Sequence, residues 1–152
     1  MLLFLKAFSE YKVKYLIVGG FAVNHYGFKR TTGDLDIYLK DTPENRKNLI
    51  DALAHLGYGE FAMLMHVPII AGYCEIMMDD GIYADLMTEI PGLDKEIFDE
   101  HLSMATQDNI NGFPVSFLHY NHLLINKRAT GRAKDQLDVM ELERINNIHL
   151  SD

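Results

Sequence analysis

The sequence contains little of what typifies secreted or membrane-bound proteins. It has no tryptophan, only four prolines and a single cysteine, Cys74, which cannot form a disulfide within the chain. A reducing compartment is therefore expected. No run of residues approaches the ~20 apolar residues that a transmembrane helix needs. The apolar start, residues 1–5, has neither the basic leader nor the small-residue cleavage site of a signal peptide. We expect a cytoplasmic protein that makes no contact with membranes.

Basic residues are also in deficit, with 14 Lys and Arg against 22 Asp and Glu and a net charge of −8. Proteins that grip nucleic acid along an extended face are usually basic, so stable DNA binding is not expected. Brief contact with an RNA end stays open, because a local patch can oppose the global charge. The 152 residues contain no repeat or linker-like tract and fit one domain.

Hydrophobic periodicity and turn residues predict an α+β fold in which helices flank a small mixed β-sheet. Helices are expected at residues 2–11, 21–26, 43–56, 94–104, 119–127 and 133–147. Strands are expected at residues 14–18, 35–39, 74–78, 82–87 and 115–118, with 67–71 as a further candidate weakened by Pro68. We expect one domain over residues 1–152, with 119–152 as a helical segment packed on it. The apolar side of the last helix is expected to carry Leu137, Met140, Leu142 and Ile145.

A glycine pair, Gly19-Gly20, separates the first predicted strand from a helix. Without a Cβ atom, the backbone can turn tightly there and approach a ligand closely. A helix that begins at such a turn presents free N–H groups, which suit phosphate oxygens. An ordinary turn explains the pair equally well when it is considered alone.

Three aspartates add to this pattern. Asp34 and Asp36 lie two residues apart on a predicted strand, so both carboxylates project from one face. Close anions repel each other unless a cation lies between them, and Mg²⁺ favours a few carboxylates together with phosphate oxygens. Asp85 interrupts an apolar strand where aspartate is disfavoured, so it needs a partner. Metal binding is the favoured explanation, and solvated strand positions are the alternative.

The segment that contains the glycine pair, a helix and Arg-X-Thr-X-Asp-X-Asp resembles the minimal nucleotidyltransferase superfamily related to DNA polymerase beta. Arg30, Thr31, Asp34 and Asp36 are assigned to this motif, which reads Arg-Thr-Thr-Gly-Asp-Leu-Asp. Residues 127–138 also resemble a Lys…Arg-X-Lys-Asp-X-X-Asp signature of its toxin-related and other uncharacterised bacterial branches. The aminoglycoside and lincosamide nucleotidyltransferases are similar more distantly.

The resemblance implies transfer of a nucleoside monophosphate from a nucleoside triphosphate, such as ATP, to a hydroxyl group. Two Mg²⁺ (or Mn²⁺) ions held by Asp34, Asp36 and Asp85 would serve an in-line displacement. The acceptor stays open between a protein, an RNA end and a small molecule, and a homodimer or an antitoxin partner is compatible with the resemblance. Many relatives have serine at the position of Gly20. Antibiotic-modifying relatives are expected to be larger, which makes a drug acceptor less expected here.

Basic residues near the two motifs are candidates for contact with the triphosphate. Lys127, Arg132 and Lys134 cluster around Gly131, where cations can stabilise charge on phosphate oxygens. The alternative is a helix end favoured by cations, followed by ordinary surface salt bridges with Asp135 and Asp138. Arg30 is expected either to position the Asp34–Asp36 loop through an ion pair or to reach phosphate. Two rival functions are a catalytically silent nucleotide-binding or partner-binding domain and a structural or oligomerisation protein.

Overall fold

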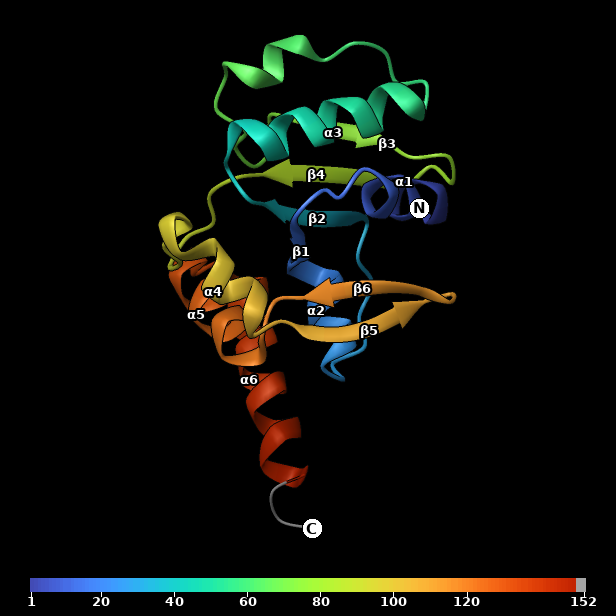
Figure 1. The fold of residues 1–152 in the computed structure, drawn as a ribbon. Coiled ribbons are helices and arrows are strands. Elements are labelled where there is room, and N and C mark those ends of the chain that lie inside the picture. Colours follow the sequence, from blue (N-terminus) through green and yellow to red (C-terminus); the bar gives the residue numbers. More distant parts are fainter. Residues whose placement is uncertain (150–152) are drawn as a thin grey trace.

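The computed structural model describes residues 1–149 and has an α+β fold built on one six-stranded mixed sheet (Figure 1). The strands are β1 (Tyr15–Ile17), β2 (Asp34–Leu39), β3 (Glu75–Met77), β4 (Tyr83–Met87), β5 (Thr106–Ile110) and β6 (Phe113–Phe117). The helices are α1 (Leu2–Glu10), α2 (Gly19–His25), α3 (Pro43–His55), α4 (Phe98–Ser103), α5 (Tyr120–Thr130) and α6 (Ala133–His149), with 3-10 turns η1 (Ala62–Met65) and η2 (Lys95–Ile97). Residues 150–152 of the predicted C-terminal segment lie outside the described range.

Strand β2 lies near the middle of the sheet, whose order is β3-β4-β2-β1-β6-β5. It pairs in parallel with β4 and antiparallel with β1. The parallel pairing sets Asp36 directly beside Asp85. Leu35 and Ile37, which alternate with the aspartates, are fully buried on the opposite face of β2. The predicted alternation of side chains between the two faces of β2 is thus confirmed at the aspartates.

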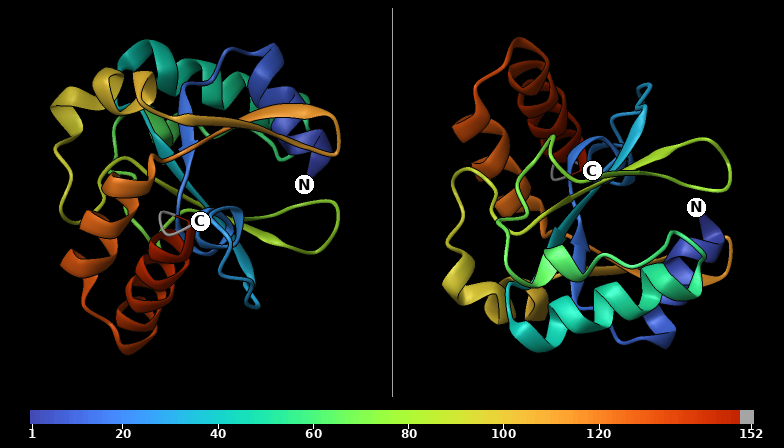
Figure 2. Two further views of the ribbon diagram at one scale, coloured as in Figure 1. Left: turned by 90° about the horizontal axis from the view of Figure 1, so that it is seen from below. Right: turned by 90° about the horizontal axis from the view of Figure 1, so that it is seen from above.

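The helices cover the sheet from two sides. In both views of Figure 2, α1 and α3 lie on one side, and the α5–α6 pair lies on the other. Helix α2 packs against β2 and α5. The core includes the aromatic pair Phe4 and Phe8, whose ring centroids are 4.4 Å apart. No helix within residues 1–149 has the length and apolarity needed to cross a membrane.

Local signals in the sequence explain where several helices begin and end. Thr42 caps α3, because its Oγ1 accepts a hydrogen bond from the Asn45 N–H at 3.2 Å, and Pro43 occupies the first helical position. Gly131 ends α5 in the left-handed conformation at φ 64°. That turn allows α6 to fold back alongside α5 and to contribute side chains to the same region.

One expectation from the hydrophobic pattern is wrong, and a second holds only in part, because Leu142 of α6 is buried as expected. Residues 67–71 form no strand; the backbone there is a loop fixed by Thr88, whose N–H donates to the Ile69 carbonyl at 2.8 Å. On α6, Leu137 and Met140 are 50% and 66% exposed. The side of α6 that packs inward carries two buried aspartates, which bind cations of other elements, so ion pairing replaces apolar contact along part of this helix.

Candidate active site

A cavity of about 620 Å³ lies where α2, the loop before β2, strands β2 and β4, and the α5–α6 pair meet. It gathers segments that are far apart in the sequence. All ten site residues predicted from the sequence line it: Gly19, Gly20, Arg30, Thr31, Asp34, Asp36, Asp85, Lys127, Arg132 and Lys134. Lining a cavity does not assign a role, so the contacts of each group decide what it is able to do.

The three aspartates lie on one face of the sheet. Asp36 and Asp85 are paired across β2 and β4, and Asp34 precedes Asp36 by two residues on the same strand. Asp34 is exposed, Asp36 is partly buried, and Asp85 is 8% exposed. The backbone N–H of Gly72 donates to Asp85 Oδ1 at 3.2 Å. The carboxylates thus range from solvent to the interior along a single face.

Burial and mutual repulsion disfavour the charged forms of these groups. The pKa of Asp36 is raised to about 6, first by burial and then by the charges of Asp34 and Asp85, against a hydrogen bond from the Gly20 N–H and the charge of Lys127. Burial also raises the pKa of Asp85, with further contributions from Glu75 and Asp34. A cation beside these carboxylates would relieve the repulsion.

The donor chemistry fits a hard divalent cation, since carboxylate oxygens are the ligands that Mg²⁺ prefers. Within residues 1–149, however, no three His, Cys, Asp or Glu side chains lie close enough together to hold a metal ion. The aspartates share a face and a cavity, but their carboxylates do not converge on one point. The metal assignment therefore stays a prediction.

The glycine pair has a visible structural reason. A Cβ atom on Gly19 would lie 1.8 Å from Asp36 Oδ2, and Gly19 has φ +60°. Only glycine lets the backbone lie this close to the carboxylate and adopt this conformation without strain. The Gly20 N–H then hydrogen-bonds to Asp36. The turn therefore accommodates Asp36, in addition to the predicted approach to a ligand.

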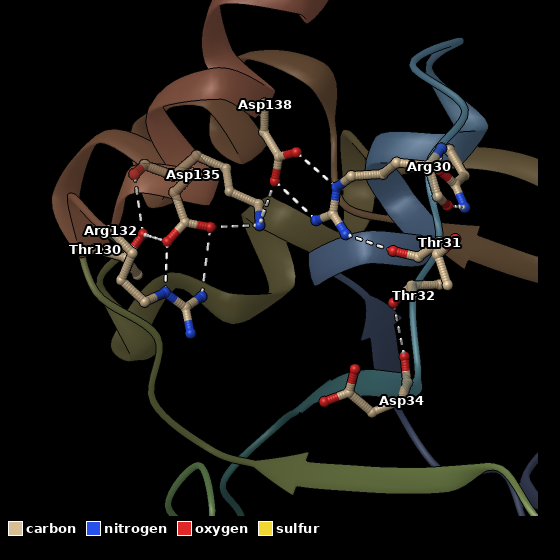
Figure 3. Close-up of polar contacts among 10 residues, drawn as sticks. Arg30, Thr31, Thr32, Asp34, Thr130, Arg132, Asp135 and Asp138 are labelled. Atoms are coloured by element: carbon tan, nitrogen blue, oxygen red, sulfur yellow. Dashed lines mark hydrogen bonds and ion pairs between the residues drawn. The ribbon is translucent and has the colours of Figure 1, made fainter.

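Most of the predicted cations are bound to carboxylates of α6. Lys127 is 3% exposed, and its Nζ lies 2.8 Å from Asp135 Oδ1 and 3.0 Å from Asp138 Oδ2. Arg30 forms a bidentate pair with Asp138 through Nε at 2.7 Å and a terminal nitrogen at 2.8 Å (Figure 3). Of the two roles open for Arg30, ion pairing is the one seen, but its partner lies on α6 and not on the Asp34–Asp36 loop.

These pairs form a buried ion cluster that consists of Arg30, Lys127, Asp135 and Asp138, with the exposed Arg132 bound at Asp135. Asp135 accepts hydrogen bonds from Arg132 Nε at 2.6 Å and Thr130 Oγ1 at 2.8 Å, as Figure 3 shows. Burial opposes ionisation of Asp135, but the bonds from Arg132, Lys127 and Thr130 outweigh it and hold the pKa of this carboxyl well below its usual range. The alternative of salt bridges with Asp135 and Asp138 is confirmed in its partners, but these are not ordinary surface pairs, because both aspartates of α6 are fully buried.

Two cations remain accessible to a ligand. The side chain of Arg132 is 59% exposed although it pairs with Asp135. Lys134 is exposed and makes no ion pair with any residue of the described range. Lys127 and Arg30, in contrast, have their charges satisfied by Asp138.

Thr32, which was not among the site residues predicted from the sequence, also lines the cavity. In the pattern Arg-X-Thr-X-Asp-X-Asp, strict spacing from Arg30 places the threonine at residue 32, not 31. The carbonyl of Thr31 accepts a hydrogen bond from Arg30 at 3.1 Å, whereas Thr32 lies two residues before Asp34. Correct register in the motif was therefore the signal that would have found it.

Comparison with solved structures identifies the fold. The chain superposes on a lincosamide antibiotic adenylyltransferase solved with lincomycin bound, with a TM-score of 0.56 and 17% identity over 93% of this chain and 92% of that one. The chain has the nucleotidyltransferase fold. An antigenic nucleotidyltransferase-like protein from Paracoccidioides brasiliensis is similar at a TM-score of 0.55 and 16% identity, over 95% of this chain and 72% of that one. A proposed nucleotidyltransferase from Thermotoga maritima is similar at 0.54 and 13%, over 96% and 86%.

No protein-family model matches the sequence, and no curated protein matches it. The assignment of the nucleotidyltransferase fold rests on the structural comparison. The sequence identities are too low to transfer a substrate from these proteins to this chain. One expectation is corrected by it: the lincosamide enzyme is not much longer than this chain, since 92% of it is covered. Length therefore gives no argument against a small-molecule acceptor.

Proposed function

We propose that this chain transfers a nucleoside monophosphate from a nucleoside triphosphate to a hydroxyl group. The observation that carries the proposal is the parallel pairing of Asp36 with Asp85, which sets three carboxylates on one face of a cavity. The nucleotidyltransferase neighbours support it, because they share the fold over most of this chain. The accessible cations that line the same cavity support it as well.

Asp34, Asp36 and Asp85 are the carboxylates that would hold Mg²⁺ or Mn²⁺ once their side chains turn toward one ion, because within residues 1–149 they do not already form a metal cluster. When bound, the metal would neutralise charge on the triphosphate and lower the pKa of the attacking hydroxyl. The protein's own contribution at Asp85 would be to accept the proton of the attacking hydroxyl, because its carboxylate lies on the same face as the other two aspartates and lines the cavity. The N–H of Gly72 orients that carboxylate.

We assign the triphosphate to the side of the cavity formed by α2 and the α5–α6 pair. Lys134 and Arg132 are the cations free enough to bind phosphate oxygens there, next to the backbone of Gly19 and Gly20 and to Thr31. Lys127 and Arg30 act as positioning residues, because their ion pairs with Asp138 join α5 and the loop before β2 to α6.

The acceptor enters, in this proposal, from the Asp85 side. There the cavity adjoins a second cavity of about 540 Å³, and Ala71, Ile90 and Pro91 line both. Ile70 and Leu93 continue this apolar lining. The rim carries Glu89, Asp94 and one lysine, without the basic surface that an RNA end favours. These features favour a small molecule or a protein side chain as the hydroxyl donor.

The decisive experiment measures Mg²⁺-dependent chemistry with each of the four nucleoside triphosphates. Pyrophosphate release and self-labelling are followed for the parent chain, for Asp36→Asn and for Asp51→Asn, a matched control on the exposed surface of α3. We expect signal from the parent and the control and at least a 100-fold loss in Asp36→Asn with the fold intact. Triphosphate binding without any release or labelling, in the presence of candidate acceptors, would instead support the catalytically silent binding domain.

A further inference from the structure

Residues 20 and 32 compete for one volume at the wall of the cavity. A Cβ atom on Gly20 would lie 2.3 Å from Thr32 Oγ1 and 2.7 Å from Thr32 Cβ. Both distances are far below van der Waals contact, so the threonine side chain can take this place only while residue 20 is glycine. The hydroxyl of Thr32 therefore stands directly over the glycine turn, where a side chain at residue 20 would otherwise project.

The hydroxyl at this place is available to a ligand. Thr32 is partly buried and lines the same cavity as Asp34 and Asp36. Its Oγ1 lies 3.4 Å from the carbonyl oxygen of Asp34, which is a long and weak hydrogen bond (Figure 3). A hydroxyl rotates freely and donates one proton, so it exchanges that contact for a stronger acceptor at little cost.

The surroundings favour an anionic acceptor. A terminal nitrogen of Arg30 lies 3.3 Å from the same Cβ position at residue 20. The pKa of Arg30 is raised first by its hydrogen bond to Asp138, and that of Arg132 first by its hydrogen bond to Asp135, so both guanidinium groups stay charged where they line the cavity. A phosphate oxygen placed over the turn would meet the Thr32 hydroxyl and Nη1 of Arg30, the terminal nitrogen that does not pair with Asp138, so Arg30 keeps its positioning ion pair.

We propose that the Thr32 hydroxyl donates a hydrogen bond to a phosphate oxygen of the triphosphate. It would supply a hydroxyl from the loop before β2 at the place where residue 20, a glycine, has no side chain. This inference rests on the proposed function, since it assigns one contact within the same nucleotide site. Thr32 is a binding residue in it, and its partner is the phosphate group, not the base.

The test measures dissociation constants by isothermal titration calorimetry with Mg²⁺, for ATP, GTP, CTP and UTP and for the nucleoside of the tightest triphosphate. Thr32→Val keeps the shape and removes the hydroxyl, and Thr32→Ser keeps the hydroxyl. We expect Thr32→Val to weaken triphosphate binding about tenfold, as for a lost hydrogen bond to a charged group, and to leave nucleoside binding unchanged. Thr32→Ser should stay within about threefold of the parent, as should Ser116→Ala on the distant β5–β6 hairpin.

A second test moves the hydroxyl from residue 32 to residue 20 by substitution. Gly20→Ser alone should weaken triphosphate binding, because its Cβ meets Thr32. Combining it with Thr32→Gly removes both clashing atoms and returns a hydroxyl to the same volume, so binding should recover relative to Thr32→Gly alone. A double variant no better than Thr32→Gly overturns the idea of a shared hydroxyl position.

The remaining outcomes separate the inference from the proposed function. A Thr32→Val protein that binds triphosphate as tightly as the parent overturns the inference alone. Equal losses for triphosphate and nucleoside also overturn it, since they indicate a purely structural residue. If the parent binds none of the four triphosphates, the proposed function itself fails. Thermal unfolding checks the fold of each variant, and Thr32→Ala replaces Thr32→Val should the latter not fold.

Discussion

Burial and the repulsion of neighbouring aspartates disfavour the charged form of Asp36 in the cavity. Its carboxylate lies against the glycine turn and beside two other aspartates, and burial is the largest reason why its pKa rises to about 6. In the unfolded chain the same group ionises near its ordinary value of 3.8. The folded state therefore holds a proton on Asp36 at pH values where the unfolded chain has lost it. This difference makes stability depend on pH in a direction that can be calculated.

Asp36→Asn should stabilise the protein in metal-free buffer, and more so at higher pH. The favourable contribution of the protonated carboxyl is present below pH 4 and is lost as the pH rises through 6. Asparagine cannot ionise, so the stability gained by the variant should be roughly 1 kcal/mol larger at pH 7.5 than at pH 5. Urea unfolding with EDTA at both pH values measures it, with Asp51→Asn as the control that shows no such trend. A gain that shrinks with rising pH would contradict the assignment.

Lys134 gives a second prediction for a single residue. It is the exposed cation of the cavity wall that makes no ion pair within the described range. Lys134→Ala should weaken triphosphate binding about tenfold without loss of stability, because a surface lysine contributes little to folding. Lys47→Ala on α3, an equally exposed lysine paired with Asp51, is the matched control. Unchanged triphosphate affinity in Lys134→Ala would move the phosphate site elsewhere in the cavity.

At the scale of elements, the buried ion cluster holds the α5–α6 pair against the rest of the fold. Asp138 binds Arg30 from the loop before β2 and Lys127 from α5, and its own side chain is 1% exposed. An apolar contact would join these elements without directional preference. The bidentate geometry fixes how the loop before β2 lies relative to α6. We infer that the cluster sets the shape of the cavity wall as well as its charge.

Asp138→Ala should therefore destabilise the protein by about 3 kcal/mol, since it leaves Arg30 and Lys127 partly unpaired in a buried place. The exposed pair of Arg128 and Glu143 provides the comparison within the same two helices. Glu143→Ala should cost less than ~1 kcal/mol. Urea unfolding of both variants at pH 7 measures the difference. Similar losses in the two variants would show that the buried cluster contributes no more than a surface salt bridge.

Some features of this region could be predicted from the sequence, and others could not. Period-two alternation placed the aspartates of β2 on one face, and the Thr42-Pro43 start of α3 was readable because capping is local. Ion pairs with Asp135 and Asp138 were among the sequence-based alternatives, but their burial and the pairing of Asp138 with Arg30 depend on how α6 packs, which helical periodicity does not describe. Carboxylate directions depend on side-chain rotamers, which no spacing rule specifies, and so convergence of the three aspartates was beyond the sequence.

At the scale of the whole molecule, an acidic chain contains a cavity that is lined by aspartates and by basic residues. The net charge is −8, yet Arg132 and Lys134 line the same cavity as the three aspartates. A triphosphate without metal would be repelled by the aspartates, and a metal without triphosphate would face the cations. Each therefore binds better when the other is present, which is positive coupling between two ligands.

This coupling predicts a specific pattern of thermal stabilisation. Mg²⁺ and triphosphate together should stabilise the chain by about 2.7 kcal/mol at a ligand concentration 100 times the Kd, and each alone should stabilise it far less. Differential scanning fluorimetry with the four triphosphates, with and without Mg²⁺, measures this, and Asp36→Asn should lose the joint effect while Asp51→Asn keeps it. The absence of any shift with all four would support the rival of a structural protein, whose acidic strand faces are merely solvated. A shift of equal size from triphosphate alone would instead show that the cations bind it without help from the aspartates.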